Sequence, residues 1–265
     1  MPYCPSCGTK TTGGDFCTAC GAQLHVDAES ASIDQHEKGP VGFAVSYIFA
    51  NGWTPFLLSA LCIAFSWLVL PYFLLYGYAY RLGRSAIRRD PVPRGYDDLI
   101  GILTDGVVFF VATIPIMIAL ALLAGIPILG AIAFESIGLA LLGILLYMGV
   151  VYVGAGVLPT FLATGSLSST YRGLAFLRFA GTIQHFKAVV LVVGISLSLS
   201  FVLLFFSIAL IVTIVGIVFI PFVYLGTVTL STLVPFTLFA YYYLEAEETN
   251  RVDPVQDPSR LRSEF

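Results

Sequence analysis

Charged residues are scarce in this sequence: they make up 11% of its 265 residues, whereas a soluble domain averages about 25%. Hydrophobic residues make up 58%, and the mean hydropathy is +0.91. A chain with so few charges cannot cover a water-facing surface, so we expect the lipid bilayer to be its main solvent. The formal net charge of −3 gives no basic footprint for nucleic acid, so we expect no nucleic acid partner.

Motifs that carry known enzyme chemistry are missing as well. The HExxH pattern of zinc hydrolases, the GxSxG pattern of serine hydrolases and the phosphate-binding P-loop do not occur. The long apolar runs also contain no charged residue, whereas ion pumps and ion-coupled carriers usually keep one at mid-membrane. We therefore predict that the protein is not an enzyme and does not couple to protons or sodium ions.

Four apolar runs are long enough to cross a bilayer, which requires roughly 20 apolar residues of helix. They cover residues 107–125, 137–161, 188–212 and 217–243. These runs predict an all-α fold, a polytopic helical membrane bundle with four full spans that occupies residues 41–245.

A fifth apolar run, residues 53–80, does not suit a single crossing. As one straight helix it would be about 42 Å long, against a hydrocarbon core of ~30 Å, and Pro71 interrupts it. We predict a broken or re-entrant pair of short helices, bent near Pro71, that enters and leaves on the cytoplasmic side. The alternative is one tilted span. Residues 41–52, just before this run, are expected to form a short interfacial helix.

Basic residues gather in two connections and in the C-terminal tail. Residues 81–106, 162–187 and 246–265 hold all ten arginines, whereas the connections near 126–136 and 213–216 have no lysine or arginine. By the positive-inside rule, the basic segments are cytoplasmic. We therefore predict a multi-pass protein of the cell membrane with a cytoplasmic tail, which we expect to be disordered because it is polar and contains two prolines.

The first 24 residues form a separate unit with four cysteines in two matched pairs. The pairs are Cys4-x-x-Cys7 and Cys17-x-x-Cys20, each preceded by an aromatic residue and followed by glycine. Two such knuckles present four thiolates to one tetrahedral Zn²⁺, and four protein ligands leave no open position for catalysis. So small a unit cannot build a core, so bound metal must supply its folding free energy. We predict a structural zinc ribbon.

Two other interpretations of the cysteine pairs are possible: two disulfides, or a redox-active CxxC motif. Disulfides need an oxidising compartment, and redox motifs do not come as two matched pairs on a minimal hairpin, so zinc is the better explanation. Residues 25–40 are polar with mixed charge and predict a flexible linker. The fifth cysteine, Cys62, lies in an apolar run and is expected to be a packing residue.

Residues 77–106 carry a distinctive pattern. It consists of Gly77-Tyr78-x-x-Arg81, a basic run, Pro93, Asp97-Asp98 and Asp105-Gly106. A later stretch adds Pro159 and a Gly165-Ser166 turn. Residues 41–245 thereby resemble domain-of-unknown-function family 4013, prokaryotic membrane proteins often fused to a zinc ribbon, and residues 1–24 resemble the generic zinc-ribbon family. Because the membrane family is uncharacterised, the resemblance implies an architecture and no activity.

The charged residues of this pattern allow two interpretations. Asp98 and Asp105 share a helix face, as do the arginines at 81, 84 and 88, so salt bridges between the two groups would pin the loop to the membrane surface. Alternatively, Asp97 or Asp98 caps one helix and Asp105 caps the next, while the arginines reach lipid phosphates. We favour caps, because capping and snorkelling explain every residue.

Together these features predict an integral membrane protein that acts as a membrane-anchored binding or adaptor module. Its partners would be the lipid bilayer and a protein docked through the zinc ribbon. The alternative function is a small permease for an uncharged or amphipathic solute, in which proline-broken helices surround a cavity.

Overall fold

The computed structural model describes residues 39–171, 174–211 and 214–255. The predicted zinc ribbon with its ligands Cys4, Cys7, Cys17 and Cys20, most of the predicted linker, and residues 256–265 lie outside the described residues.

Every regular element in the described part of the chain is a helix, which confirms the all-α class. A short N-terminal helix, Gly39–Ile48, comes first. It is followed by α2 (Thr54–Ala64), α3 (Val69–Ile87), α4 (Leu99–Leu120), the π-helix η1 (Ala121–Gly125), α5 (Ile126–Phe134), α6 (Ile137–Ala155), α7 (Val157–Thr164), α8 (Leu167–Tyr171), α9 (Ala175–Ala180), α10 (Ile183–Ile211) and α11 (Ile214–Glu248).

Four helical stretches of the described chain are long and apolar enough to cross a membrane. They are Leu99–Phe134, Ile137–Thr164, Ile183–Ile211 and Val218–Glu248, and each contains most or all of one predicted run. The multi-pass prediction is thereby confirmed. The last stretch ends beyond residue 246, so the predicted start of the tail falls inside α11.

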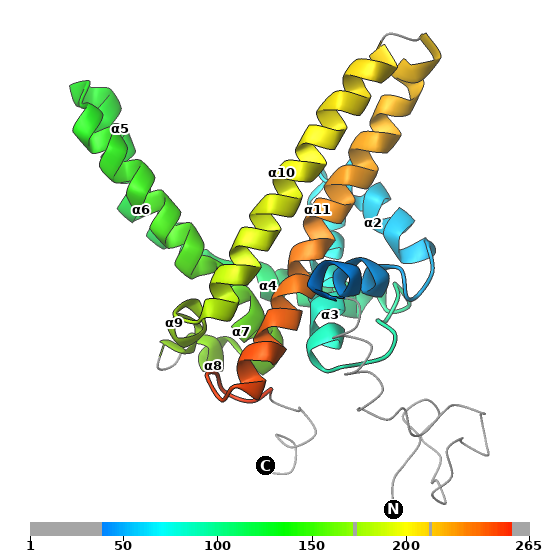
Figure 1. Cartoon of the computed structure of the whole chain (residues 1–265), viewed down its shortest axis with the longest axis horizontal. Helices are drawn as coiled ribbons and strands as arrows, with labels where there is room; N and C mark the ends of the chain where they lie inside the picture. Colours follow the sequence, from blue (N-terminus) through cyan, green and yellow to red (C-terminus); the bar gives the residue numbers. More distant parts are fainter. Residues whose placement is uncertain (1–38, 172–173, 212–213, 256–265) are drawn as a thin grey trace, which may run out of the picture.

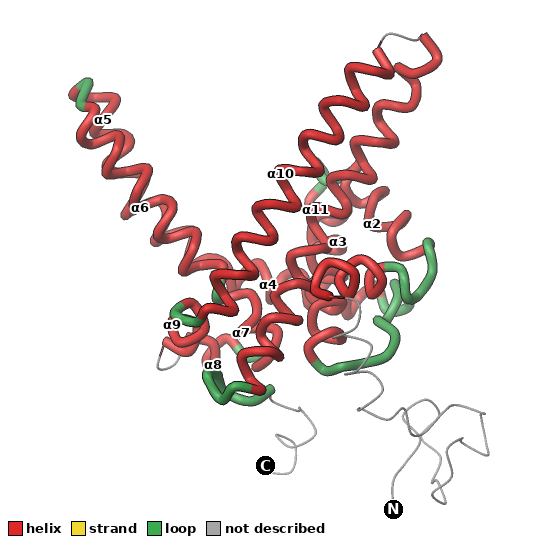
Figure 2. Tube along the Cα trace, in the orientation of Figure 1, coloured by secondary structure: helices red, strands yellow, loops and turns green. Residues whose placement is uncertain are grey.

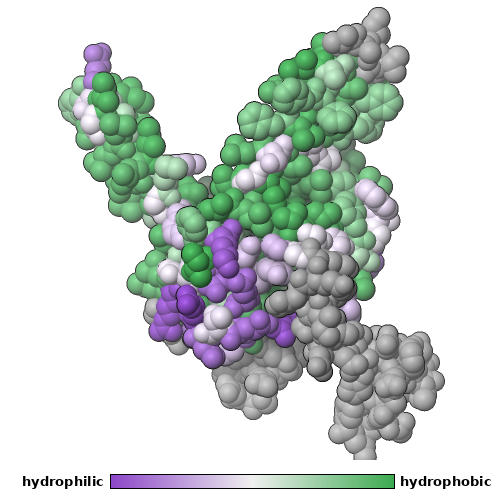
Figure 3. All heavy atoms as spheres, in the orientation of Figure 1, coloured by the Kyte–Doolittle hydropathy of each residue, from purple (hydrophilic) through white to green (hydrophobic). Residues whose placement is uncertain are grey.

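Two long helical hairpins diverge from a common base (Figure 1). In one, η1 and α5 pack against α6, and in the other α10 packs against α11. The base consists of the N-terminal helix, α2, α3, α7, α8, α9 and the adjoining ends of the long helices. On the face drawn in Figure 3, hydrophobic residues cover both hairpins and hydrophilic residues gather on the base.

The buried core lies in the base and not between the hairpins. Its largest fully buried side chains include Tyr78, Phe161, Phe179 and Tyr243. In the most apolar window of Ile183–Ile211, by contrast, 0% of the residues are buried inside the protein. Helices that expose apolar side chains along their length suit a lipid environment, because lipid tails are as apolar as leucine.

The apolar run at residues 53–80 is not one helix. Helices α2 and α3 divide it, and a turn over residues 65–68 joins them. The predicted bend near Pro71 is therefore present, although Pro71 itself is the third residue of α3. Proline is tolerated in the first turn of a helix, where its missing N–H has no intrahelical partner to lose. The chain therefore bends just before the proline.

The N-terminal helix lies across the base, between the loop after α3 and the end of α11. It buries Phe43 and Tyr47 on one face and exposes Val41 and Val45 on the other. The ring of Phe43 lies 5.7 Å from that of Tyr241 in α11. This amphipathic burial agrees with the short interfacial helix expected just before the apolar run.

Candidate functional site

Helices α3 and α4 approach each other backbone to backbone at two glycines. A Cβ atom added at Gly77 would lie 1.9 Å from the main-chain oxygen of Ile102. One added at Gly106 would lie 2.0 Å from the main-chain oxygen of Phe73. No side chain fits in either place, so glycine is required at both positions for this close helix packing.

One turn beyond this contact, Arg81 of α3 binds two carboxylates. Its Nε lies 2.5 Å from Asp105 Oδ2, and its Nη2 lies 3.1 Å from Asp98 Oδ2. The Arg81 side chain is only 18% exposed, and these two carboxylates compensate its partly buried charge. The salt bridges considered between the two groups of charged residues are therefore present at Arg81, although caps were the favoured interpretation.

Asp98 also caps α4, so one residue serves both of the roles considered for it. Its carboxylate accepts a hydrogen bond of 3.0 Å from the N–H of Gly101. This bond, together with the Arg81 guanidinium, lowers the pKa of Asp98 below its ordinary value. The prediction that Asp105 caps the next helix is wrong: Asp105 lies inside α4, in the second turn, because the helix begins at Leu99.

Four arginines gather around a small pocket beside these ion pairs, which we call the arginine pocket. Its volume is about 140 Å³. It is lined by Tyr80, Arg81, Arg84, Ser85, Arg88, Asp90, Arg94 and Asp105, from α3, α4 and the loop between them. Four guanidinium groups and two carboxylates give the lining a formal charge of +2.

Arg84 reaches this pocket past Gly165, the residue that follows α7. Its Nη1 donates a 3.0 Å hydrogen bond to the hydroxyl of Tyr80. Its Nε is buried and has no hydrogen-bond partner among the described residues. A Cβ at Gly165 would lie 2.3 Å from Arg84 Nη2, and Gly165 has a left-handed φ of +63°. The glycine of the predicted Gly165-Ser166 turn therefore makes room for the arginine.

The loop over residues 88–98, here called the arginine loop, is fixed by hydroxyl groups from neighbouring elements. Tyr47 Oη of the N-terminal helix donates a 3.0 Å hydrogen bond to the carbonyl of Asp90. Tyr96 Oη lies 2.9 Å from Ser59 Oγ of α2, and its ring stacks on that of Tyr78. Burial raises the pKa of both Tyr47 and Tyr96, so each remains a neutral hydroxyl.

The contacts of Tyr47 and Tyr96 were not expected from the sequence. An alternating or helical pattern of tyrosines shows which face of an element is buried. It does not show with which distant group a tyrosine hydroxyl forms a hydrogen bond. Residue pairs 43 and 37 positions apart make these hydrogen bonds.

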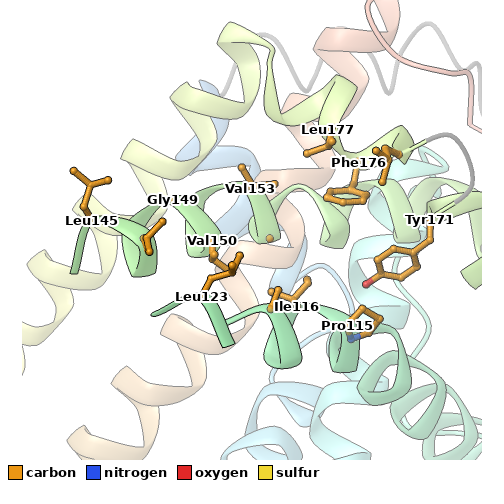
Figure 4. Close-up of a pocket in the computed structure, with 14 residues that line it drawn as sticks. Pro115, Ile116, Leu123, Leu145, Gly149, Val150, Val153, Tyr171, Phe176 and Leu177 are labelled. Carbon is orange, nitrogen blue, oxygen red and sulfur yellow. The ribbon is translucent and has the colours of Figure 1, made fainter. Parts of the chain in front are cut away.

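A second cavity, of about 580 Å³, lies between α4, η1, α6, Tyr171 of α8 and residues 174–177 (Figure 4). Its walls include Pro115 and Ile116 of α4, Gly149 and Val150 of α6, and Phe176. Tyr171 carries the only polar side chain of the lining, and its hydroxyl donates to the carbonyl of Ala112. Such a cavity suits an apolar group.

The described histidine and cysteine, residue types that often take part in catalysis, are packed among other side chains here. His185 is fully buried, with Nε2 2.9 Å from the carbonyl of Tyr152 and its ring against Phe179 and Phe239. Cys62 is half-buried in α2, as a packing residue would be. Within residues 39–255, as far as the structure describes them, no group of three or more His, Cys, Asp or Glu side chains is placed to hold a metal.

Comparisons with protein-family models, with curated proteins and with solved structures found no match. The resemblance to family 4013 therefore remains a prediction. The structure nevertheless brings its motif together, because Gly77, Arg81, Asp98, Asp105 and Gly106 all belong to the crossing of α3 and α4.

Proposed function

We propose that the protein is a membrane-anchored adaptor that docks a protein partner through an N-terminal zinc ribbon on the cytoplasmic side. The observation that carries this proposal is the position of the N-terminal helix. Its Tyr47 binds the arginine loop and its Phe43 contacts α11. The chain that carries the four cysteines therefore joins the described part at the base, beside the arginine loop.

The end of α11 lies at the same base. Arg89 of the arginine loop pairs with Glu248 at 3.0 Å, and Lys187 at the start of α10 pairs with Glu245 at 3.2 Å. If the arginine loop is cytoplasmic, as the positive-inside rule favours, then both ends of the described chain are cytoplasmic too. A thiolate zinc site belongs in that reducing compartment.

The α2–α3 hairpin suits this topology, because a short turn joins its two helices and the chain comes back to the base. Helix α2 has 11 residues and is about 16 Å long, too short to cross a ~30 Å core. The turn after it exposes Phe65, Trp67 and Leu68 and lies on the side of the base from which the long hairpins extend (Figure 2). We propose that this hairpin is re-entrant, with its apolar turn inside the bilayer.

Site-directed cross-linking in native membranes tests the adaptor role. A photo-reactive residue at Thr12, within the proposed ribbon of the full-length protein, is expected to give one discrete cross-linked partner. Cys4→Ser together with Cys7→Ser removes two zinc ligands and is expected to abolish that product and the bound zinc. Cys62→Ser is the matched control and should change neither. A metal-free ribbon, or a product that persists in the double variant, would contradict the proposal.

A permease is the second candidate, and the apolar cavity of about 580 Å³ beside Pro115 favours it. Gly149→Leu places a side chain in the open part of this cavity, since nothing lies within 4 Å of an added Cβ. In proteoliposomes, a permease for amphipathic solutes would move a fluorescent lysophospholipid, and Gly149→Leu would slow it. Equal flux in wild-type, variant and protein-free vesicles would exclude this role for the cavity.

A further inference from the structure

Two arginines that line the arginine pocket, Arg84 and Arg94, have no carboxylate within salt-bridge distance among the described residues. Within its lining, Asp105 is engaged by Arg81, and Asp90 is the second acid beside the remaining arginines. The pocket therefore favours an anion, because unbalanced guanidinium groups held close together repel one another.

Arg84 supplies the donor that such an anion would use. Its Nε–H is buried without a partner among the described residues, although the pocket that its side chain lines is polar. A guanidinium group presents its N–H donors as a planar fork, which matches the spacing of phosphate oxygens. Tyr80 engages only Nη1 of Arg84, so the guanidinium group keeps further N–H donors for an anion in the pocket that it lines.

The pocket lies where a bilayer would meet water. Asp105 forms part of its wall and belongs to α4, which continues directly into the first candidate span. Val107 and Val108 follow within one turn, and they are 42% and 37% exposed. A lipid whose acyl chains cover such apolar residues would have its headgroup at the level of the arginines.

We propose that the arginine pocket binds a phosphate group, which an anionic lipid headgroup or a soluble phosphate presents. Its volume of about 140 Å³ leaves room for a group of this size, since a cavity needs only about 10–15 Å³ of such volume to hold one water. Arg84 and Arg94 bind the phosphate, while Arg81 stays paired with its acids and keeps α3 and α4 together. This site does not depend on the zinc ribbon or on the adaptor role.

Binding measurements on the full-length protein in detergent test the proposal. Titration with phosphatidylglycerol is followed by native mass spectrometry, and titration with sodium phosphate by thermal unfolding against sodium chloride of equal ionic strength. Arg84→Gln and Arg94→Gln are each expected to weaken binding about fivefold, as for one arginine at an anionic surface. Arg178→Gln is the matched control, because it removes one arginine from the base at an exposed ion pair with Asp253.

Each outcome decides the matter. Saturable binding of phosphatidylglycerol without a response to phosphate supports the site and identifies the lipid as its source. Stabilisation by phosphate supports the site with a soluble ligand. No binding in either titration, or equal losses in the Arg94→Gln and Arg178→Gln variants, overturns the proposal. Arg94 is exposed, so its variant gives an answer even if Arg84→Gln fails to fold.

Discussion

Arg81 and Arg84 lie one turn apart on α3, yet their surroundings assign them different roles. Arg81 is bound by two carboxylates, whereas Arg84 is bound by one neutral hydroxyl and keeps a buried donor unpaired. A partly buried charge with matched partners stabilises a fold, and its removal leaves the partner uncompensated. An arginine without a matched carboxylate can instead bind an external anion, as we propose for Arg84.

The two acids that bind Arg81 are expected to differ in their contribution to stability. Asp105→Asn leaves Arg81 partly buried with a single carboxylate and is expected to lower the free energy of unfolding by about 1–3 kcal/mol. Asp98→Asn should have a smaller effect, because asparagine also caps helices and the Asp98 side chain is 63% exposed. Thermal unfolding of both variants in detergent micelles measures this order, and a larger loss in Asp98→Asn would contradict it.

The pKa of Asp98 gives a pH dependence with a definite sign. Its pKa is lower in the folded protein than in the unfolded chain, so its stabilising contribution is complete above the ordinary value of about 3.9 and is lost as the pH falls through the lowered value. In Asp98→Asn the decrease in melting temperature on acidification should be smaller than in the wild-type protein. Identical acid profiles would show that Asp98 contributes no such linkage.

Gly165 is expected to be sensitive to substitution because of its backbone angle and because of Arg84. Gly165→Ala must adopt a φ of +63° and places a methyl group against the guanidinium group. We expect a loss of about 1–2 kcal/mol in the free energy of unfolding, together with weaker phosphate binding. Gly181→Ala is the control, since its φ is −81° and the nearest atom to an added Cβ lies 3.5 Å away.

At the scale of elements, the crossing of α3 and α4 depends on two glycines that occupy the same contact. An added methyl group at Gly77 or at Gly106 would push the two backbones apart, and overpacking of this kind typically costs about 1–3 kcal/mol. One separation of α3 from α4 relieves the steric clash of both substitutions. The double variant Gly77→Ala/Gly106→Ala should therefore lose less stability than the sum of the single losses. Gly226→Ala, with open space around its Cβ, should be near neutral.

The long helices could be predicted from the sequence because hydropathy is a local property of each run. The break in residues 53–80 was also predictable, since 28 residues are too long for one crossing and too few for two. The exact position of the break was not predictable, because a proline suggests a break at itself, whereas α3 accommodates Pro71 in its first turn. The close contact of Gly77 with Ile102 likewise depends on how two helices cross, which no local pattern encodes.

The candidate site was predictable in part. The seven-residue spacing of Asp98 and Asp105 indicated a shared face, and both do meet Arg81. The pocket itself needs the arginine loop to fold back over α3, held by Tyr47 and Tyr96 from distant positions. Hydrogen bonds between such remote residues follow from the tertiary fold and leave no spacing signal in the sequence.

At the scale of the whole molecule, the two hairpins should place their tips on the side of the membrane opposite the base. Glu135 lies at the tip of the α5–α6 hairpin with a left-handed backbone. In a Cys62→Ser background, Glu135→Cys should react with an impermeant thiol reagent in intact cells. Arg88→Cys and Ser259→Cys should react only after the membrane is permeabilised. Labelling of Ser259→Cys in intact cells would reverse the proposed orientation.

The contact between Gly77 and Gly106 has a mechanical consequence. Two helices that touch through their backbones have no flexible side chains between them to absorb a displacement, so α3 and α4 behave as a single lever. If a change in bilayer thickness tilts the long α4 stretch, we expect the arginines on α3 to turn with it. Tyr47 links the arginine loop to the N-terminal helix, so we expect the same rotation to reach that helix.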